Sequence, residues 1–561
     1  MTALVVTEAG LVASRGYQEF RQYFPQPGWV EHLPEDIWQA TLAACRQALD
    51  RAGGNPVSCV GITNQRETAV LWDRATLAAP RRAIVWQDRR TARICAQLRE
   101  AGHEPRVAAL TGLRLDPYFT GTKLTWLAEH EPATWQGLAD GSLAAGTVDA
   151  YLIARMTSGA RHVTDASNAS RTLLFDIQAG QWSAELCELL RVPQRALPEV
   201  VPSTGVAAQT DPAAFLGLAL PVAGLAGDQQ AALFGQACFA PGDTKCTYGT
   251  GSFVLANTGP AIVRSAAGLL STVAWMDGAG ELTYALEGSV FVTGAAVQWL
   301  RDGLGLLDDA AQSEALARSV PDSAGVVFVP ALTGLGAPDW DPDARGAVFG
   351  ITRGTTRAHL VRATLEAIAF EVRDVTDVIT EATGQHGRAL RADGGASAND
   401  LLMQLQADQL QLPVERPVVG ETTALGAAFL AGLATGTWSS RDELAATWRL
   451  DRRFEPGPRL DPDYARWRRA VDRVKGWASL DDEGVSTDRT AAAGLVVVFD
   501  DEVATPISTP YSAATSTPMA RNMPTRPLAP LDSTSRQGWS PPIHPVPSAG
   551  WEASSPNRPH G

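Results

Sequence analysis

The sequence predicts an α/β protein. Strand-like and helix-like stretches alternate over most of its 561 residues, as in sheets covered by helices. The clearest strand-like stretches are CVGITNQ (59–65), ALPVAGLAGD (219–228), GVVFVPAL (325–332) and ALRADGG (389–395). The clearest helix-like stretches are residues 34–52, 357–382 and 399–410.

The two ends of the chain have their own character. Residues 1–24 read as two short strands around a turn at Glu8, Ala9 and Gly10, so the sequence opens inside a hairpin without a neighbouring strand. Residues 479–561 are rich in Ser and Thr and hold about a dozen prolines. Such a composition cannot bury enough apolar surface to offset chain entropy, so we expect a disordered tail with GLVVVF (494–499) as its only apolar run.

Composition narrows the class of protein. The net charge is −14 and the pI about 5.1, which argues against nucleic-acid binding. The six cysteines show no CxxC pair and the eight histidines no HExxH, so no metal site or disulfide framework is expected. No apolar run approaches 18 residues and no signal peptide stands at the start, so we expect a soluble cytoplasmic protein without a membrane partner.

The stretch LAGDQQAALFG (225–235) allows two interpretations of its acid. Asp228 ends a run of small residues and precedes an apolar, helix-like pattern. An aspartate there can cap the helix by accepting hydrogen bonds from its first N–H groups. It can also serve as a general base at the mouth of a cleft.

Three glycine-rich stretches could approach a ligand closely. YGTGSF (248–253) is a tight turn between extended segments, and its N–H groups could hold a phosphate or simply close a hairpin. RADGGASAND (391–400) leads from a strand into a helix expected near Ser397, which could cap it. ETTALGAAFLAGLATG (421–436) is a helix of small residues, suited to a flat ligand or to tight packing.

Three polar stretches could bind a small polyol. NQRET (64–68) follows a buried-looking strand, at the position where α/β proteins place ligands, although a solvated loop would look the same. WQDRRT (86–91) and DPYFTGTK (116–123) set aromatic among polar side chains. Together they would offer apolar faces to carbon and fixed polar groups to hydroxyls, although each could be ordinary half-buried structure.

Eight motifs taken in order resemble bacterial glycerol kinases of the FGGY sugar-kinase family. They are GITNQRET, AIVWQDRRTA, DPYFTGTK, LAGDQQAALFGQ, TYGTGSF, YALEGSVFVTGAAVQWLRD, VPALTGLGAPDWDPDARG and DGGASAND, and the likeness runs from about residue 3 to about 475. It implies two ribonuclease-H-like domains of the actin and hexokinase type flanking a cleft. The glycerol-binding domain would span 1–236 and the nucleotide-binding domain 237–478. NQRET with GDQQ resembles the glycerol branch more than xylulose or gluconate kinases.

The resemblance also implies roles for single residues. It implies ATP with Mg²⁺, glycerol as the substrate, and a homo-oligomer as one option. Asp228 resembles the catalytic base. The glycerol-hydroxyl ligands would be Arg66, Glu67, Tyr118, Asp228 and Gln229, the apolar wall Trp86 and Phe253, and the nucleotide contacts Thr250, Gly294, Gln298, Gly395 and Asn399.

Two departures from the family pattern stand out. Family members carry a strand and a DxGTTSSR-like phosphate loop before the stretch that matches ALVV (3–6), so we expect this segment and its magnesium-binding carboxylate to be absent here. Regulated members use a Gly-x-Arg motif before the base to bind fructose 1,6-bisphosphate. Here the corresponding stretch is GLA (217–219), so Gly217 is kept and Ala219 stands in place of the arginine.

The sequence therefore predicts ATP-dependent phosphorylation of glycerol to sn-glycerol 3-phosphate. Two rivals remain open. The chain could be a catalytically impaired protein that binds glycerol or a partner, which the expected loss of the phosphate loop favours. It could also be a kinase for another polyol or sugar.

Overall fold

The computed structural model describes residues 1–54, 56–481 and 496–497. The predicted tail (479–561) lies mostly outside these residues. A 3₁₀ turn, Trp477–Asp481, overlaps its start, and Val496–Val497 form strand β24. No helix among the described residues is long and apolar enough to cross a membrane.

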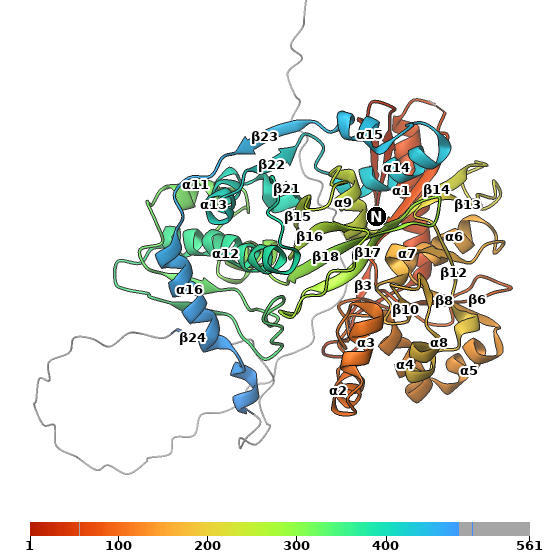
Figure 1. The fold of residues 1–561 in the computed structure, drawn as a ribbon, viewed down its shortest axis with the longest axis horizontal. Helices are drawn as coiled ribbons and strands as arrows, with labels where there is room; N and C mark the ends of the chain where they lie inside the picture. Colours follow the sequence, from red (N-terminus) through yellow and green to blue (C-terminus); the bar gives the residue numbers. More distant parts are fainter. Residues whose placement is uncertain (55, 482–495, 498–561) are drawn as a thin grey trace, which may run out of the picture. The chain divides into compact units, whose positions relative to one another are not determined.

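A seven-stranded mixed sheet forms the centre of the second half of the chain (Figure 1). Its strands β15 and β21, and β21 and β22, are parallel, whereas its other neighbours are antiparallel. In spatial order the strands are β17 (Leu270–Met276), β18 (Leu282–Val290), β16 (Ser252–Gly259), β15 (Thr244–Tyr248), β21 (Leu390–Asp393), β22 (Val414–Pro417) and β23 (Leu450–Phe454).

The first half is built around a smaller sheet. Strand β14 (Pro221–Gly227) lies between β13 (Thr204–Gln209), antiparallel to it, and β5 (Val60–Asn64), parallel to it. The other sheets have two or three strands each, and all but the last of them belong to the first half of the chain. They are β1 (Thr2–Val6) with β2 (Val12–Tyr17); β3 (Gln22–Tyr23), β4 (Glu31–His32) and β7 (Ala83–Ile84); β6 (Val70–Asp73) with β8 (Leu143–Gly146); β9 (Val163–Asp165) with β12 (Glu199–Val201); β10 (Phe175–Asp176) with β11 (Gln181–Trp182); and β19 (Val327–Val329), β20 (Ala347–Phe349) and β24.

Sixteen α-helices lie in the described part of the chain. They are α1 (Pro34–Arg51), α2 (Ala92–Glu100), α3 (Glu104–Thr111), α4 (Thr120–His130), α5 (Pro132–Asp140), α6 (Val148–Met156), α7 (Ala166–Ala169), α8 (Ala184–Leu189), α9 (Asp228–Gly235), α10 (Gly294–Gln298), α11 (Gln312–Arg318), α12 (Arg357–Thr383), α13 (Asp400–Leu410), α14 (Thr422–Thr435), α15 (Arg441–Thr447) and α16 (Asp461–Val474).

The core shows why the two sheets hold together. Side chains of α12 and α13 pack on one face of the large sheet, in a cluster that includes Tyr248 and Ile368. Side chains of α9 and α14 pack on its other face, in a cluster that includes Phe234 and Trp275. Helix α14 also contacts β5 and β14, so α9 and α14 lie between the two sheets.

The small residues of α14 serve tight packing. A Cβ on Gly426 would lie 1.8 Å from the carbonyl oxygen of Ala231 in α9. A Cβ on Gly61 in β5 would lie 2.1 Å from the carbonyl oxygen of Ala427. Since both approaches are backbone to backbone, packing explains this helix without a bound ligand.

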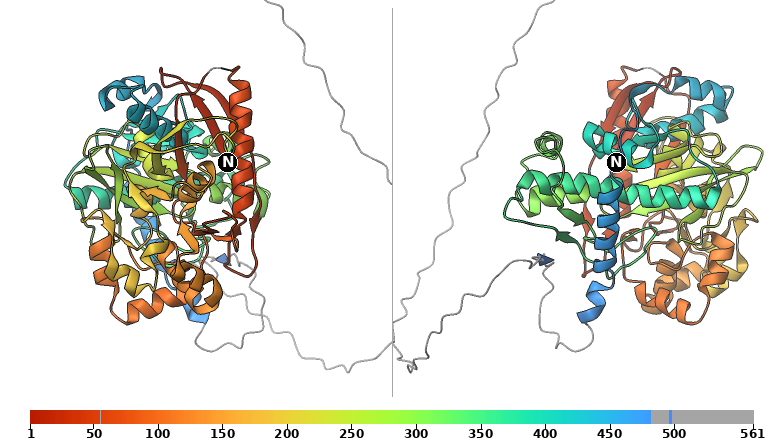
Figure 2. Two further views of the ribbon diagram at one scale, coloured as in Figure 1. Left: turned by 90° about the vertical axis from the view of Figure 1, so that its right-hand side faces the viewer. Right: turned by 60° about the vertical axis from the view of Figure 1, so that its left-hand side comes forward.

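The opening hairpin stands apart from the sheet beside it. Among the described residues, β1 pairs only with β2, and β5 pairs only with β14. A largely apolar groove of about 590 Å³ lies between them, lined by residues 1–9 and 56–63 and by small side chains of α14 such as Ala428 and Ala431. The left view of Figure 2 shows the red hairpin alongside α1. Both β1 and β5 thus present an unpaired edge to one groove.

We expect a strand added ahead of Met1 to fill this groove. An extension of five small apolar residues and a tight turn would pair with both free edges and bury their N–H and C=O groups. The melting temperature should rise by about 5 °C, on the scale of a one to two kcal/mol gain. Differential scanning calorimetry would measure it against an equally long Gly/Ser extension. Equal melting temperatures would mean that the groove does not accept a strand.

Candidate active site

Two neighbouring parallel strands bring the first group of predicted residues together. Gly227 at the end of β14 pairs with Asn64 at the end of β5. Because both strands end at the same edge, Arg66 and Glu67 after β5 meet Asp228 after β14. This edge is the place where parallel sheets commonly bind ligands.

Arg66 is the centre of the group. Its guanidinium is buried, with Nε 3.1 Å from Oδ1 of Asp228 and 3.5 Å from Oε1 of Glu67. Its Nη2 lies 3.3 Å from the hydroxyl of Tyr118. One side chain therefore positions three of the predicted glycerol ligands.

Two further buried residues, Glu287 and Arg171, were not predicted from the sequence, and they form ion pairs with Arg66 and Glu67. Arg66 donates to both carboxylate oxygens of Glu287 on β18, at 2.5 and 3.1 Å. Arg171 donates to Glu287 at 3.0 Å and to Glu67 at 2.8 Å. The available signal for Glu287 is a lone acid inside the apolar strand YALEGSV (284–290); Arg171 gives no comparable signal.

The two arginines control the ionisation of Glu287. Burial alone raises the pKa of this carboxyl, but the guanidinium groups of Arg171 and Arg66 outweigh burial and hold the pKa at about 2. Glu287 is therefore an anion at neutral pH, and it holds Arg66 in place from the second half of the chain.

Asp228 does not occupy the N-cap position of α9. It is the first residue of α9, whose N-cap is Gly227, and its Oδ1 accepts from the N–H of the adjacent Gln229 at 2.7 Å. Its side chain is 35% exposed, unlike Arg66 and Glu67, so a substrate can reach it. Burial raises the pKa of Asp228, and the nearby Arg66 opposes that rise.

A further missed residue, Lys245, reaches this group from β15. Its Nζ donates to the amide oxygen of Gln229 and, at 2.8 Å, to the hydroxyl of Thr247. Burial lowers the pKa of Lys245, while Asp393 raises it. The amide NH₂ of Gln229 donates no hydrogen bond to any of the described residues. A lysine inside the buried strand TKCTY (244–248) was the signal for this position.

The three predicted aromatic residues lie around Arg66. The rings of Trp86 and Tyr118 meet edge to face with centroids 5.5 Å apart. The ring centroid of Phe253 lies 5.9 Å from the guanidinium carbon of Arg66. All three rings are partly exposed.

The second group of predicted residues lies at one edge of the large sheet. Thr247 in β15 pairs with Asp393 in β21, so the turn with Thr250 and the turn with Gly395 follow neighbouring parallel strand ends. The N–H of Gly294 donates to the carbonyl of Gly249 at 3.0 Å, which brings α10 to the same place. A Cβ on Gly294 would lie 2.6 Å from that carbonyl oxygen, so this approach requires glycine.

The remaining predicted nucleotide contacts differ in their surroundings. Gln298 ends α10 and is exposed, as are Thr250 and Gly395. Asn399 caps α13 by accepting from the N–H of Leu402 at 2.9 Å, and its amide donates to Ser313 at 3.2 Å. The prediction that this helix starts near Ser397 was wrong: a 3₁₀ turn, Gly395–Ala398, comes first, and the Ser397 hydroxyl donates to Gly394.

The β15–β16 hairpin joins the two groups. It carries Lys245, which contacts Gln229, and Phe253, which contacts Arg66, while its turn carries Thr250. The hairpin therefore contacts the charged group around Arg66 and also carries one of the exposed glycine-rich turns. Such an arrangement can orient a small hydroxylated molecule next to a phosphate-bearing one.

Two family models match the chain. Residues 1–235 match the N-terminal domain of the FGGY family of carbohydrate kinases, and residues 244–435 match its C-terminal domain. The chain belongs to the FGGY family of carbohydrate kinases. The predicted α/β fold, with two ribonuclease-H-like domains of the actin and hexokinase type, is confirmed.

Individual FGGY kinases are closely similar over most of the chain. A glycerol kinase of Aromatoleum aromaticum is 55% identical over 482 residues, covering 85% of this chain and 97% of that protein. A glycerol kinase of Symbiobacterium thermophilum is 54% identical over 483 residues, covering 85% and 96%. The crystal structure of Plasmodium falciparum glycerol kinase with ADP superposes with a TM-score of 0.78 at 34% identity, covering 84% of this chain and 96% of that one.

Proposed function

We propose that this FGGY kinase transfers the γ-phosphoryl group of ATP to glycerol, giving sn-glycerol 3-phosphate and ADP. The observation that carries the proposal is the accessible carboxylate of Asp228 held at 3.1 Å by the buried Arg66, beside a free amide of Gln229. The relatives named glycerol kinase, at more than half identity, favour glycerol over other acceptors.

Asp228 would act as the general base. Its carboxylate accepts the proton of a terminal hydroxyl while that oxygen attacks the γ-phosphorus and the bond to the ADP oxygen breaks. Arg66, Glu67, Tyr118 and Gln229 would hold the hydroxyls in line with the phosphate. Trp86 and Phe253 would cover the carbon chain and keep water away, because an open site would hydrolyse ATP.

The turns at Thr250 and Gly395 would hold the nucleotide, with Gly294, Gln298 and Asn399 near them. Mg²⁺ neutralises phosphate charge and typically binds one or two protein carboxylates together with phosphate oxygens. The described residues contain no group of three or more metal-ligating side chains, so the ion would be held mainly by the phosphate oxygens of ATP.

A coupled assay for ADP release would test the function. The purified chain should turn over with glycerol and ATP, and much more slowly with xylulose or erythritol. Faster turnover on another polyol would identify that polyol, and not glycerol, as the substrate. Glycerol binding by calorimetry without turnover would favour the impaired binding protein. Cytoplasmic location and homo-oligomerisation stay predictions.

The pH dependence of turnover should report the ionisation of the Asp228 carboxyl group. Its pKa is raised by burial, and only the ionised carboxylate can accept a proton. We therefore expect kcat to fall as the pH drops, along a limb whose midpoint lies above the ordinary aspartate pKa of about 3.9. The measurement is kcat at saturating substrates from neutral to acid pH. A constant kcat down to the acid-unfolding range would contradict this.

Fructose 1,6-bisphosphate should not inhibit the enzyme. Arginine grips phosphate through its planar fork, and Ala219 offers no such group. Among the described residues, no arginine or lysine side chain bonds to any residue from 211 to 221. A titration to millimolar concentrations should leave the rate unchanged. Strong inhibition would place a bisphosphate site elsewhere on the protein.

A further inference from the structure

Lysine is rare in this chain, and its placement is uneven. Of the 47 lysines and arginines, only Lys123, Lys245 and Lys475 are lysines. Lys475 is partly exposed and pairs with Asp339 and Asp472, whereas Lys123 and Lys245 are fully buried. Because arginine fills nearly every other basic position, a lysine in the interior points to a need for its compact ammonium group.

The ammonium group of Lys123, in the first turn of α4, bonds to the main chain of two predicted glycerol ligands. Its Nζ donates to the carbonyl oxygen of Tyr118 at 2.5 Å and to that of Glu67 at 3.2 Å. The hydroxyl of Thr120 donates to the same carbonyl of Glu67 at 3.1 Å. Lys123 forms no ion pair with any of the described residues, so its charge is directed at these two main-chain oxygens.

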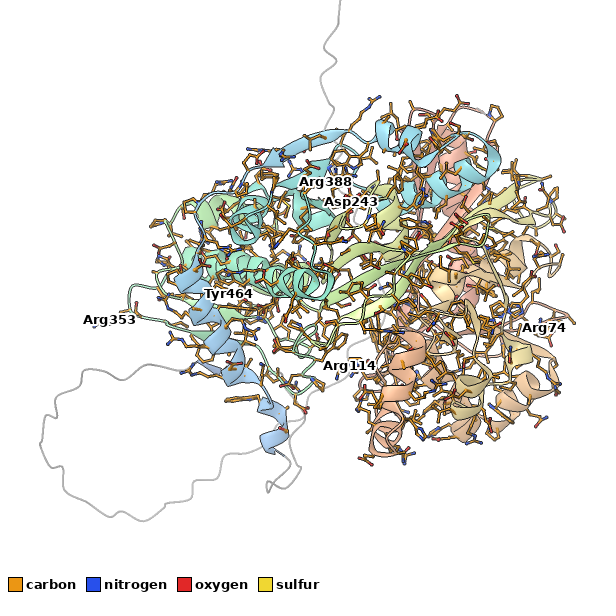
Figure 3. All side chains as sticks on the ribbon, viewed as in Figure 1. Arg74, Arg114, Asp243, Arg353, Arg388 and Tyr464 are labelled. Carbon is orange, nitrogen blue, oxygen red and sulfur yellow. The ribbon has the colours of Figure 1, made fainter. Side chains whose placement is uncertain are left out.

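These contacts join two loops that are distant in the sequence. Glu67 follows β5, and Tyr118 lies in the loop between α3 and α4, which Arg114 marks in Figure 3. The side chains of the two loops meet at Arg66, whose Nε is 3.5 Å from Oε1 of Glu67 and whose Nη2 is 3.3 Å from the hydroxyl of Tyr118. Arg66 therefore ties the loops through their side chains, and Lys123 ties them through their main chain.

We propose that Lys123 is a positioning residue for the glycerol site, an inference that rests on the proposed function. It holds the main chain at Glu67 and Tyr118 so that their side chains converge with Arg66 on one hydroxyl-binding position. An ammonium suits this task because it presents three donors on a compact head, whereas the planar fork of arginine is larger. Charge-assisted hydrogen bonds of this kind are stronger than neutral ones.

The protonation of Lys123 provides a measurable signature. Burial lowers the pKa of Lys123 to about 8, and the facing carboxylates of Glu67, Asp88 and Asp116 oppose this shift. The thiol of Cys95 on α2 also faces the ammonium, but burial raises the pKa of Cys95 to about 12, so this thiol stays neutral. Lys123 is therefore charged at neutral pH. It loses its proton as the pH rises through about 8, which weakens its bonds to the two carbonyls.

The substitution Lys123→Met in the full-length chain tests this role, because methionine is of similar length and has no donor. We expect the KM for glycerol to rise about tenfold, the effect of losing one charge-assisted hydrogen bond, and kcat to change by less than about threefold. In the parent, the KM measured from about pH 7 to about 9.5 should rise with a midpoint near 8. This rise with pH should be absent from Lys123→Met.

Hydrogen exchange measures the positioning without any substrate. The amides of residues 65–68 and 116–119 should exchange faster in Lys123→Met than in the parent. Lys475→Met is the matched control and should leave both exchange and KM unchanged. Lys475 directly follows α16, and this helix, marked by Tyr464 in Figure 3, lies on the other side of the molecule from α4.

A milder variant covers the case in which Lys123→Met does not fold. Thr120→Val removes a neutral hydrogen bond to the carbonyl of Glu67 and keeps the ammonium. It should raise the KM about threefold and retain the rise with pH. An unchanged KM in Thr120→Val would mean that this carbonyl need not be held, and the proposal would fall.

The other outcomes separate this proposal from the proposed function. Unchanged exchange in Lys123→Met would overturn the positioning. A rise of KM with pH that survives the substitution would also overturn it, because Lys245 would then be the source, and so would a fall in kcat as large as the rise in KM. A parent chain that does not turn over glycerol would instead refute the proposed function, and with it any role of Lys123 towards glycerol.

Discussion

Replacing Asp228 by asparagine is expected to lower kcat by a factor of about 10²–10⁴, which is the usual contribution of a positioned general base. The amide keeps the size of the side chain and can still hydrogen-bond a hydroxyl, so the KM for glycerol should change much less. The side chain is accessible and is not the N-cap of α9, so the helix itself should survive the change.

Asp442→Asn is a matched control for this prediction. Asp442 is an exposed aspartate in the first turn of α15. It should leave kcat and the melting temperature near those of the parent. If Asp228→Asn retains kcat within a few-fold, then Asp228 has a structural role and the assignment as base is wrong. A parallel fall in melting temperature would point the same way.

Much of the site could be predicted because strand ends carry local signals. Arg66, Glu67 and Asp228 each follow an apolar strand directly, and the parallel pairing of β5 and β14 brings them together. The turns with Thr250 and Gly395 are marked by glycine, which is needed where backbones approach closely. These features depend on a few adjacent residues, so a single sequence contains them.

The residues that were missed depend on contacts across the chain. Glu287 is 221 positions from Arg66, and its partner Arg171 is 116 positions away. A charged residue in an apolar strand signals a buried partner, yet the sequence does not say which one. The sequence likewise left open whether Asp228 caps its helix, and only the structure shows that α9 begins at Asp228 with Gly227 as its N-cap. The role of Asp228 as a base stays a prediction.

The helix of small residues shows the same limit. Glycine and alanine in α14 suit a flat ligand as well as tight packing, because both need a surface without bulky side chains. Only the positions of Gly426 against Ala231 and of Gly61 against Ala427 decide for packing. The start of α13 was misplaced for a related reason, since Ser397 and Asn399 are both good caps and the 3₁₀ turn between them leaves no sequence signal.

Replacing Glu287 by glutamine is expected to cost about 3–5 kcal/mol of unfolding free energy at neutral pH, because it removes one partner from a buried ion-pair network. Arg66 and Arg171 would keep their charges with only Glu67 and Asp228 nearby. Glutamine has nearly the same volume, so loss of packing should contribute little. Urea unfolding followed by circular dichroism would measure the change, with the exposed Glu281→Gln as the control.

The pH dependence of stability shows whether Glu287→Gln destabilises the fold through the missing charge or through a change of shape. The folded-state pKa of Glu287 is about 2, below its ordinary value of about 4.3, so the carboxylate stabilises the fold fully above the unfolded-state pKa. That contribution, about 3 kcal/mol at roughly 1.4 kcal/mol per pKa unit, is lost as the pH falls from about 5 towards 2. The parent should therefore lose stability over this range more steeply than Glu287→Gln, and the difference between them should shrink as the pH drops. A difference that stays constant from pH 7 to the acid limit of measurement would mean that the glutamine variant is destabilised by its shape and not by the missing charge.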